Sequence, residues 1–207
     1  MNEFLFGIVH QFAGKWALLD DFAIICGNWG PELIAITLVA WWWRDTFASG
    51  PRRMTMDGMI FSIGISIVLA LFINWVMNQL YWQPRPFVVH SFTPLIPHGA
   101  EESSFASDHA IVGFGVAWMV TRARMAFSWV FVTWVWVLVI AWSRVFAGVH
   151  YPIDMVGSFV ISAILCEFVF RTFRKIQSEP DGGQDQWFRK SYVVFKKFSV
   201  YIRKYKE

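Results

Sequence analysis

The sequence predicts an all-α integral membrane protein, a polytopic bundle of about five or six transmembrane helices. Its 207 residues are 56% hydrophobic and only 16% charged, whereas soluble domains average about 45–50% apolar and about 25% charged residues. Met59 to Met77 and Met125 to Trp142 contain no charged residue. Runs of this length cross the hydrocarbon core as helices, and a soluble domain of this size could not bury several of them.

Each predicted crossing follows from one apolar segment. The first ends at 40–43 and begins somewhere within 20–33, because Gly30 and Pro31 obscure its start. The four others are expected at about 58–81, 109–122, 125–143 and 151–172. The N-terminal segment MNEFLFGIVHQFAGKW lacks an early basic cluster and is broken by polar residues. It is predicted to lie at the membrane interface rather than to act as a signal peptide, with a sixth crossing left open.

Basic residues predict the orientation of these crossings. Three regions that share one side when the crossings alternate are basic. They contain Arg44, Arg52 and Arg53, then Arg122 and Arg124, then Arg171, Arg174 and Lys175. The positive-inside rule makes that side cytoplasmic. On the opposite, outer side, loops 82–108 and 143–151 contain Arg85 and Arg144 as their only Lys or Arg residues. Two isolated arginines on the outer side, where basic residues are uncommon, need an explanation other than membrane orientation.

The sequence divides into a membrane domain, 1–172, and a cytoplasmic tail, 173–207. The tail opens with a polar linker, QSEPDGGQDQ, and continues with basic pairs every seven residues, at 189–190, 196–197 and 203–204. This period places the pairs on one face of a helix. The segment therefore predicts an amphipathic helix on an anionic leaflet, with a frayed, solvated tail as the alternative.

Three polar clusters fall on the outer side: QPRPF at 83–87, SFASDHA at 104–110 and SRVFAGVHYPID at 143–154. Each has an ordinary structural explanation alone. An arginine can anchor a helix end, Ser107 and Asp108 can cap a helix, and His150 and Asp154 can form an i,i+4 pair. Together on one membrane face they predict a functional site, because ionisable groups near a bilayer are costly.

These residue types suit phosphoryl transfer. Arg85 and Arg144 offer planar forks for phosphate oxygens, and the helix start at Ser107 offers a hydroxyl and free amides to the same anion. Asp154, one turn after His150, can fix the tautomer of that histidine and leave one ring nitrogen free to attack phosphorus. His109 can act as acid and then base. The residues predict a phosphohistidine route stabilised by arginines.

No metal or other cofactor is expected. No carboxylate cluster suited to Mg²⁺ is present, with Glu101 and Glu102 a weak exception. His90 and His98, in the same outer loop, are interpreted as interfacial polar residues, with a second contact to a diphosphate as the alternative. The membrane is a predicted partner, nucleic acid is not, and the oligomeric state stays open.

The pattern Arg85-Pro86, Ser107-x-His109 and Ser143-Arg144-x5-His150-x3-Asp154 resembles the signature of the type 2 phosphatidic acid phosphatase superfamily. That signature is K-x6-R-P, P-S-G-H and S-R-x5-H-x3-D, and its third part is complete here. The resemblance spans roughly 70–170. It implies that His150 is the nucleophile, that His109 is the general acid, that Asp154 supports the nucleophile, and that the other matched residues bind phosphate.

The chain departs from this signature in two of its motifs. Asn78 stands where the family has its first lysine, and P-S-G-H appears as Ala106-Ser107-Asp108-His109. The longer stretch QPRPFVVHSFTPLIPHGAEESSFASDHA resembles the bacitracin-resistance type of undecaprenyl-diphosphate phosphatases, which carry S-D-H. Asp108 is therefore interpreted as a mark of this subgroup, and Asn78 as a neutral donor to phosphate.

The resemblance implies hydrolysis of undecaprenyl diphosphate to the monophosphate, which recycles the cell-wall lipid carrier at the outer face of a bacterial plasma (inner) membrane. Three alternatives stay open. One is the same chemistry on phosphatidylglycerophosphate, phosphatidate or lipid A. Another is phosphate transfer to a second lipid, and the last is a catalytically dead lipid-binding protein, suggested only by Asn78. A vanadate-dependent peroxidase uses a similar constellation, but such enzymes are soluble.

Overall fold

The computed structural model describes residues 1–47 and 55–178, and the side chains of 41–59 and 176–178 are not described. Arg44, Arg52, Arg53 and the predicted basic pairs of the tail therefore lie outside the described side chains. The chain divides into two compact units, Met1–Phe170 and Arg171–Glu207. The described residues form seven helices: α1 (Asn2–His10), α2 (Ala17–Phe47), α3 (Thr55–Leu80), α4 (Pro86–Val89), α5 (Asp108–Arg122), α6 (Phe127–Phe146) and α7 (Pro152–Ser178).

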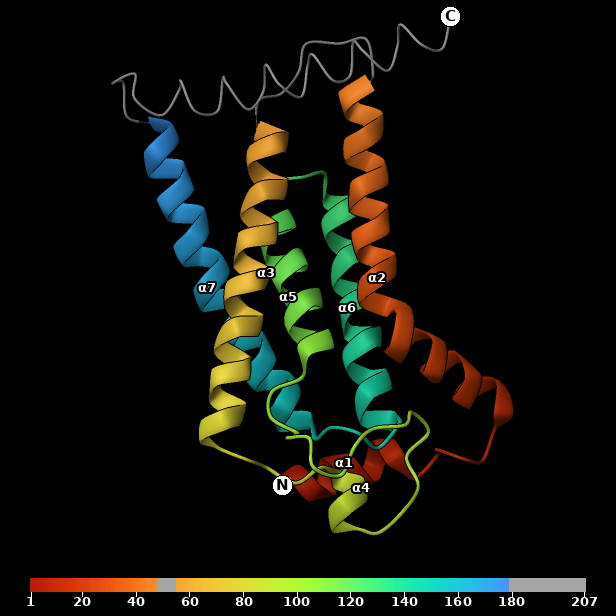
Figure 1. The fold of residues 1–207 in the computed structure, drawn as a ribbon. Coiled ribbons are helices and arrows are strands. Elements are labelled where there is room, and N and C mark those ends of the chain that lie inside the picture. The colour runs from red at the N-terminus through yellow and green to blue at the C-terminus, as the bar shows by residue number, and fades with distance from the viewer. Residues whose placement is uncertain (48–54, 179–207) are drawn as a thin grey trace, which may run out of the picture. The chain divides into compact units, whose positions relative to one another are not determined.

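The prediction of an all-α multi-pass membrane protein is confirmed, because the described segments contain helices and no strand (Figure 1). Four helices are long and apolar enough to span a bilayer, over Ala17–Ala40, Ile60–Leu80, Phe127–Phe146 and Pro152–Lys175. The third of the five predicted crossings, α5, has 15 residues. At 1.5 Å per residue it covers about 22 Å, less than the ~30 Å hydrocarbon core, so the predicted count of five or six is only approximate.

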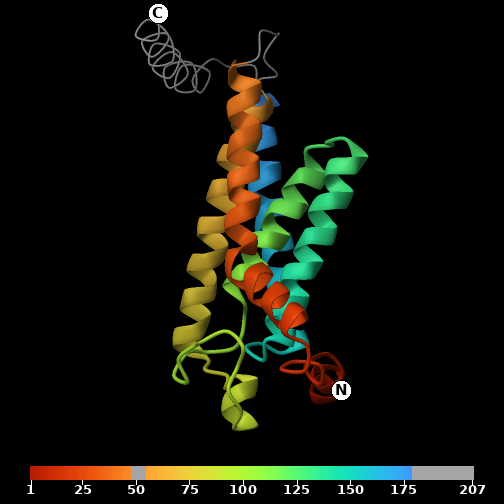
Figure 2. The ribbon, with the colours of Figure 1, turned by 90° about the vertical axis from the view of Figure 1, so that its right-hand side faces the viewer.

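Two helix boundaries differ from the prediction. α2 begins at Ala17 and continues through Pro31, although Gly30 and Pro31 had obscured its start. Proline removes one helical hydrogen bond and bends a helix without ending it when neighbouring helices support the turn, and α2 is visibly bent (Figures 1 and 2). α7 continues to Ser178, past the predicted end at 172.

Small polar side chains join α7 to α5. Ser158 Oγ accepts a hydrogen bond from Ser107 N at 3.0 Å, Ser162 Oγ donates to Ile111 O at 2.9 Å, and Cys166 Sγ lies 3.6 Å from Gly115 O. These side chains are four residues apart, so they share one face of α7. Small residues allow membrane helices to approach closely, and the same face carries Asp154 one turn earlier, toward the start of α5.

Helices α1 and α4 lie with the long loops at one end of the bundle (Figures 1 and 2). With nine residues, α1 is too short to cross a bilayer, so it does not supply a sixth crossing. It is tied to the bundle end by Glu3, which contacts His90 at 2.9 Å, and by His10, whose Nδ1 donates to Phe146 O at 2.9 Å. Phe6 is buried, stacks on His10 and meets the Tyr151 ring edge to face.

Candidate active site

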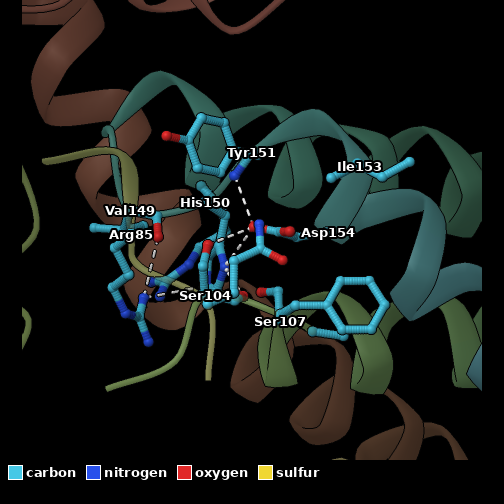
Figure 3. A network of polar contacts seen from close by, with 12 residues as sticks. Arg85, Ser104, Ser107, Val149, His150, Tyr151, Ile153 and Asp154 are labelled. Atoms are coloured by element: carbon cyan, nitrogen blue, oxygen red, sulfur yellow. Dashed lines mark hydrogen bonds and ion pairs between the residues drawn. The ribbon is translucent and has the colours of Figure 1, made fainter. Parts of the chain in front are cut away.

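Four of the residues predicted to bind or attack phosphate or to support that attack lie together, namely Arg85, Ser107, His150 and Asp154 (Figure 3). Arg85 directly precedes α4, Ser107 directly precedes α5, Arg144 lies in the last turn of α6, and Asp154 lies in the first turn of α7. His109 is the second residue of α5. Arg144, His150 and Asp154 are only 1%, 3% and 0% exposed. Four chain segments, at 85, 107–109, 144 and 150–154, therefore contribute to one largely buried polar cluster.

A glycine turn brings His150 back toward Arg144. Gly148 has a φ of +81°, a conformation that glycine adopts without strain. Its N–H donates to Val145 O at 3.1 Å, and Val149 N donates to Arg144 O at 3.3 Å. This pair of hydrogen bonds is a Schellman motif, which ends a helix and reverses the chain. His150 follows two residues later, so the motif fixes the spacing between the arginine and the histidine.

The ring of His150 is held in one tautomer. Its Nδ1 lies 2.7 Å from Ser104 O, and a carbonyl only accepts, so Nδ1 carries the proton and Nε2 keeps its lone pair. Nε2 faces Arg85 Nη1 at 3.4 Å. Burial, and then the charges of Arg144 and Arg85, lower the pKa of His150 well below its ordinary value. The imidazole is therefore neutral at neutral pH, as a nucleophile requires.

Asp154 supports this ring in a less direct way than the sequence predicted. Its Oδ2 is 3.5 Å from His150 Nδ1, while it accepts Ser104 Oγ at 2.5 Å and Tyr151 N at 2.8 Å. The closest partner of Nδ1 is instead the Ser104 carbonyl. Asp154 thus holds Ser104, and Ser104 holds the ring. Ser104 was not among the predicted site residues, because a backbone carbonyl carries no signal in the sequence.

Arg85 connects the segment before His150 to Glu102, further along the outer loop. Its Nη1 donates to Val149 O at 3.2 Å, and its Nη2 donates to Glu102 Oε2 at 3.1 Å. Burial lowers the pKa of the guanidinium and Glu102 opposes that shift, but arginine starts so high that it stays charged. Glu102, which the sequence left as a weak candidate for binding Mg²⁺, is thus the ion-pair partner of Arg85.

Arg144 is held by two neighbours that the sequence did not reveal. Its Nη1 donates to Gly27 O at 3.3 Å, and its Nη2 lies 2.8 Å from His98 Nε2. Burial, and then Arg144 and Arg85, lower the pKa of His98 to about 4, so neutral His98 accepts from Arg144. The structure therefore places His98 beside the predicted phosphate-binding arginines. His90 contacts Glu3 instead.

Several buried polar atoms of the site have no hydrogen-bond partner, among them Ser107 Oγ, Asn78 Oδ1 and Arg144 Nε. Buried polar atoms are rarely left unpaired. Ser107 occupies the N-cap position of α5 but makes no side-chain capping bond, so capping does not explain it. An anion would satisfy Ser107 Oγ and Arg144 Nε. His109 is half-buried, lies close to the backbone of Asn28 and is near enough to Arg144 and Arg85 to feel their charges.

Asn74, one turn before Asn78, holds the loop that carries Ser107. The Asn74 side chain is 1% exposed. Its Oδ1 accepts Ala106 N at 3.0 Å, and its Nδ2 donates to Ala106 O at 2.9 Å and to Asp108 Oδ1 at 2.7 Å. Asp108, the departure from the family glycine, therefore has a buried partner on α3. A polar residue inside the apolar run of α3 was the available signal for Asn74.

We expect Asn74→Ala to lower the melting temperature and to lower kcat/KM about tenfold, because it leaves the Ala106 backbone and Asp108 unpaired beside Ser107. Thermal unfolding in detergent and phosphate release would be measured together. Asn78→Ala, one turn along α3, is the control for unfolding, because no hydrogen bond to Asn78 Oδ1 is present. Equal melting temperatures for the two variants would contradict this prediction.

Acidification should destabilise the protein between pH 6.5 and about 4. His98 takes up its proton near pH 6.5 when unfolded but only near pH 4 when folded, so the unfolded state binds more protons in this window and is favoured there. Above pH 6.5 the contribution of neutral His98 to the free energy of unfolding is fully present. His98→Gln should flatten the dependence of the melting temperature on pH, whereas an unchanged slope would rule out His98 as a contributor.

Comparisons with known proteins show which family the chain resembles. Residues 59–178 match the PAP2 superfamily. The chain is 29% identical to undecaprenyl-diphosphatase BcrC of Bacillus subtilis, over 83% of each chain. It is 31% identical to the putative undecaprenyl-diphosphatase YbjG of Escherichia coli, over 80% of this chain and 79% of that protein.

Two solved membrane proteins share the fold. LpxE of Aquifex aeolicus has a TM-score of 0.63 at 21% identity and covers 82% of this chain and 94% of its own. A PAP2-type phosphatidylglycerolphosphate phosphatase from Bacillus subtilis has a TM-score of 0.59 at 18% identity and covers 84% of this chain and 85% of its own. The resemblance inferred from the motifs is confirmed, and the chain belongs to the PAP2 superfamily.

Proposed function

We propose that this protein is a membrane phosphatase that hydrolyses undecaprenyl diphosphate to undecaprenyl phosphate and inorganic phosphate. The observation that carries the proposal is the buried, neutral His150, whose Nε2 lone pair faces the Arg85 guanidinium at 3.4 Å. A lone pair beside a phosphate-binding cation is the arrangement needed for attack on phosphorus. Two relatives with similarity over most of the chain are named as undecaprenyl-diphosphatases, which supports this choice of lipid.

The proposed reaction has two steps. His150 Nε2 forms a bond to the terminal phosphorus, the bond from that phosphorus to the bridging oxygen breaks, and His109 gives its proton to the leaving oxygen. His109 then removes a proton from water as the water oxygen attacks the phosphohistidine. The P–N bond breaks, and inorganic phosphate and free His150 are regenerated. Arg85, Arg144 and Ser107 stabilise the charge on the phosphoryl oxygens, with Asn78 as a further neutral donor.

An apolar groove of about 320 Å³ supports a lipid substrate. It is lined by Met77, Leu80, Tyr81, Gln83, Phe105 and Ile153, which come from the end of α3, the outer loop and the start of α7. Phe105 directly follows Ser104, and Ile153 directly precedes Asp154 and points away from His150 (Figure 3). The first isoprenoid units of the substrate would lie here while its phosphates reach the arginines.

We propose that the site faces the periplasm across a bacterial inner membrane. The turn between α5 and α6 carries Arg122 and Arg124 and lies at the opposite end of these helices from α1, α4 and the outer loops (Figure 1). Short loops rich in arginine are retained in the cytoplasm. This arrangement supports release of phosphate on the outer side, where the lipid carrier is released after it delivers its sugar.

Phosphate release by the purified protein would test the substrate. Undecaprenyl diphosphate, phosphatidylglycerophosphate, phosphatidate and lipid A would be compared in detergent, each with and without chelator. We expect the fastest release from undecaprenyl diphosphate and no effect of chelator. Faster release from another lipid would reassign the substrate, and a chelator-sensitive rate would overturn the arginine-based mechanism. Recovery of the phosphate on a second lipid rather than in water would show a phosphotransferase.

A further inference from the structure

A proline inside α2 frees one backbone carbonyl next to the site. Pro31 is buried within the helix and has no N–H, so the carbonyl four residues earlier, that of Gly27, loses its α-helical partner. A buried carbonyl without a partner is costly. Arg144 Nη1 donates to this carbonyl at 3.3 Å, so the arginine supplies the hydrogen bond that the proline cannot.

The backbone of α2 approaches α6 closely at this point. A Cβ added to Gly27 would lie 2.7 Å from Ile96 Cδ1 and 3.2 Å from Ser143 Oγ, so only glycine fits there without movement. Gly27 and Pro31 are both buried. The backbone of the next residue, Asn28, lies close to His109. One turn of α2 therefore lies beside both an arginine and a histidine of the proposed active site.

We propose that Pro31 is a positioning residue for phosphate binding, because it leaves the Gly27 carbonyl free to orient the Arg144 guanidinium. With Nη1 on Gly27 and Nη2 on His98, the plane of the guanidinium is fixed, and Nε, which has no partner, remains available to an anion. An arginine fork binds phosphate through its direction as well as its charge. This inference rests on the proposed function for its substrate, but the orientation of Arg144 is tested separately below.

Pro31→Ala is the direct test. Alanine restores an N–H that competes with Arg144 for the Gly27 carbonyl, and it also favours the helix. We expect orthovanadate, a phosphate mimic, to bind about tenfold more weakly, as when one hydrogen bond to a charged group is lost. The melting temperature should be unchanged or higher. A purely structural proline would give the opposite pattern, with lower stability and unchanged affinity, and that result would overturn the proposal.

Ile34→Val is the matched control, because it removes a methyl group from another buried residue of α2 and leaves the backbone intact. It should bind orthovanadate like the unmodified protein, and an equal loss of affinity would show that packing alone is responsible. In an Arg144→Lys background, Pro31→Ala should have less effect, because the residue through which it acts is altered. Fully additive losses would contradict the proposal.

Binding of orthovanadate separates this inference from the choice of substrate. Failure of the unmodified protein to hydrolyse undecaprenyl diphosphate would refute the proposed function but leave the comparison of Pro31 variants valid. Equal orthovanadate affinity of Pro31→Ala and the unmodified protein would refute the role of Pro31, even when hydrolysis proceeds as proposed.

Discussion

Replacing His150 with alanine is expected to abolish phosphate release, lowering kcat by about 10⁴-fold or more, because the proposed nucleophile is removed. Burial and the Ser104 carbonyl hold the ring with its Nε2 lone pair toward Arg85, so the loss should appear in the chemical step. Release of phosphate from undecaprenyl diphosphate would be followed in single-turnover and steady-state experiments.

His109→Ala is the second variant, and its reaction products would be compared with those of His150→Ala. His109→Ala should slow both proposed steps, because His109 is the acid of the first and the base of the second. Labelled substrate that does react should remain on the protein as a phosphohistidine, and this adduct should be absent from His150→Ala. Both variants should unfold near the temperature of the unmodified protein for the comparison to hold. Substantial activity of His150→Ala, or an adduct that survives in it, would refute attack by this histidine.

Arg85→Ala is expected to lower kcat/KM about 10³-fold, since arginines that neutralise a transferring phosphoryl group contribute 10³–10⁵ in rate. Arg85→Lys should recover only part of this loss, because lysine keeps the charge but not the planar fork. The comparison of kcat with KM for the two variants would show how much of the interaction forms only in the transition state.

Glu102→Gln distinguishes a direct role of Arg85 on phosphate from a structural role of its ion pair with Glu102. Glu102 pairs with Arg85 at 3.1 Å, but its side chain is 51% exposed, and exposed ion pairs contribute little to stability. We therefore expect Glu102→Gln to change kcat/KM only a few-fold. A loss as large as that of Arg85→Ala would mean that Arg85 acts through its pairing with Glu102 rather than on phosphate.

Much of the fold follows from the sequence because its dominant signal is local. Uncharged runs predicted α3 and α6 nearly to their ends. The starts and ends that were missed depend on tertiary context: Pro31 stays helical because neighbouring helices support the bent turn, and α7 continues through Arg171 and Arg174. Charged residues near a membrane surface do not stop a helix, because long side chains extend to water.

The sequence predicted the side chains of the candidate site but not the backbone groups that orient them. Arg85, Arg144 and His150 were identifiable because their residue types and spacing are unusual in an apolar chain. The atoms that orient them were not, since Ser104 O and Gly27 O are backbone groups 46 and 117 residues away in sequence. Sequence patterns record the reacting groups, whereas their orientation depends on contacts that only folding creates.

The groove beside the start of α7 bears on which part of the lipid is recognised. Its walls are almost entirely apolar, yet a bilayer already solvates an isoprenoid tail as well as protein side chains do, so moving the tail from lipid to protein releases little free energy. Discrimination must then reside in the anionic head. Short and long isoprenoid diphosphates should compete on nearly equal terms in a membrane, which makes a short-chain analogue a fair substitute for the natural lipid.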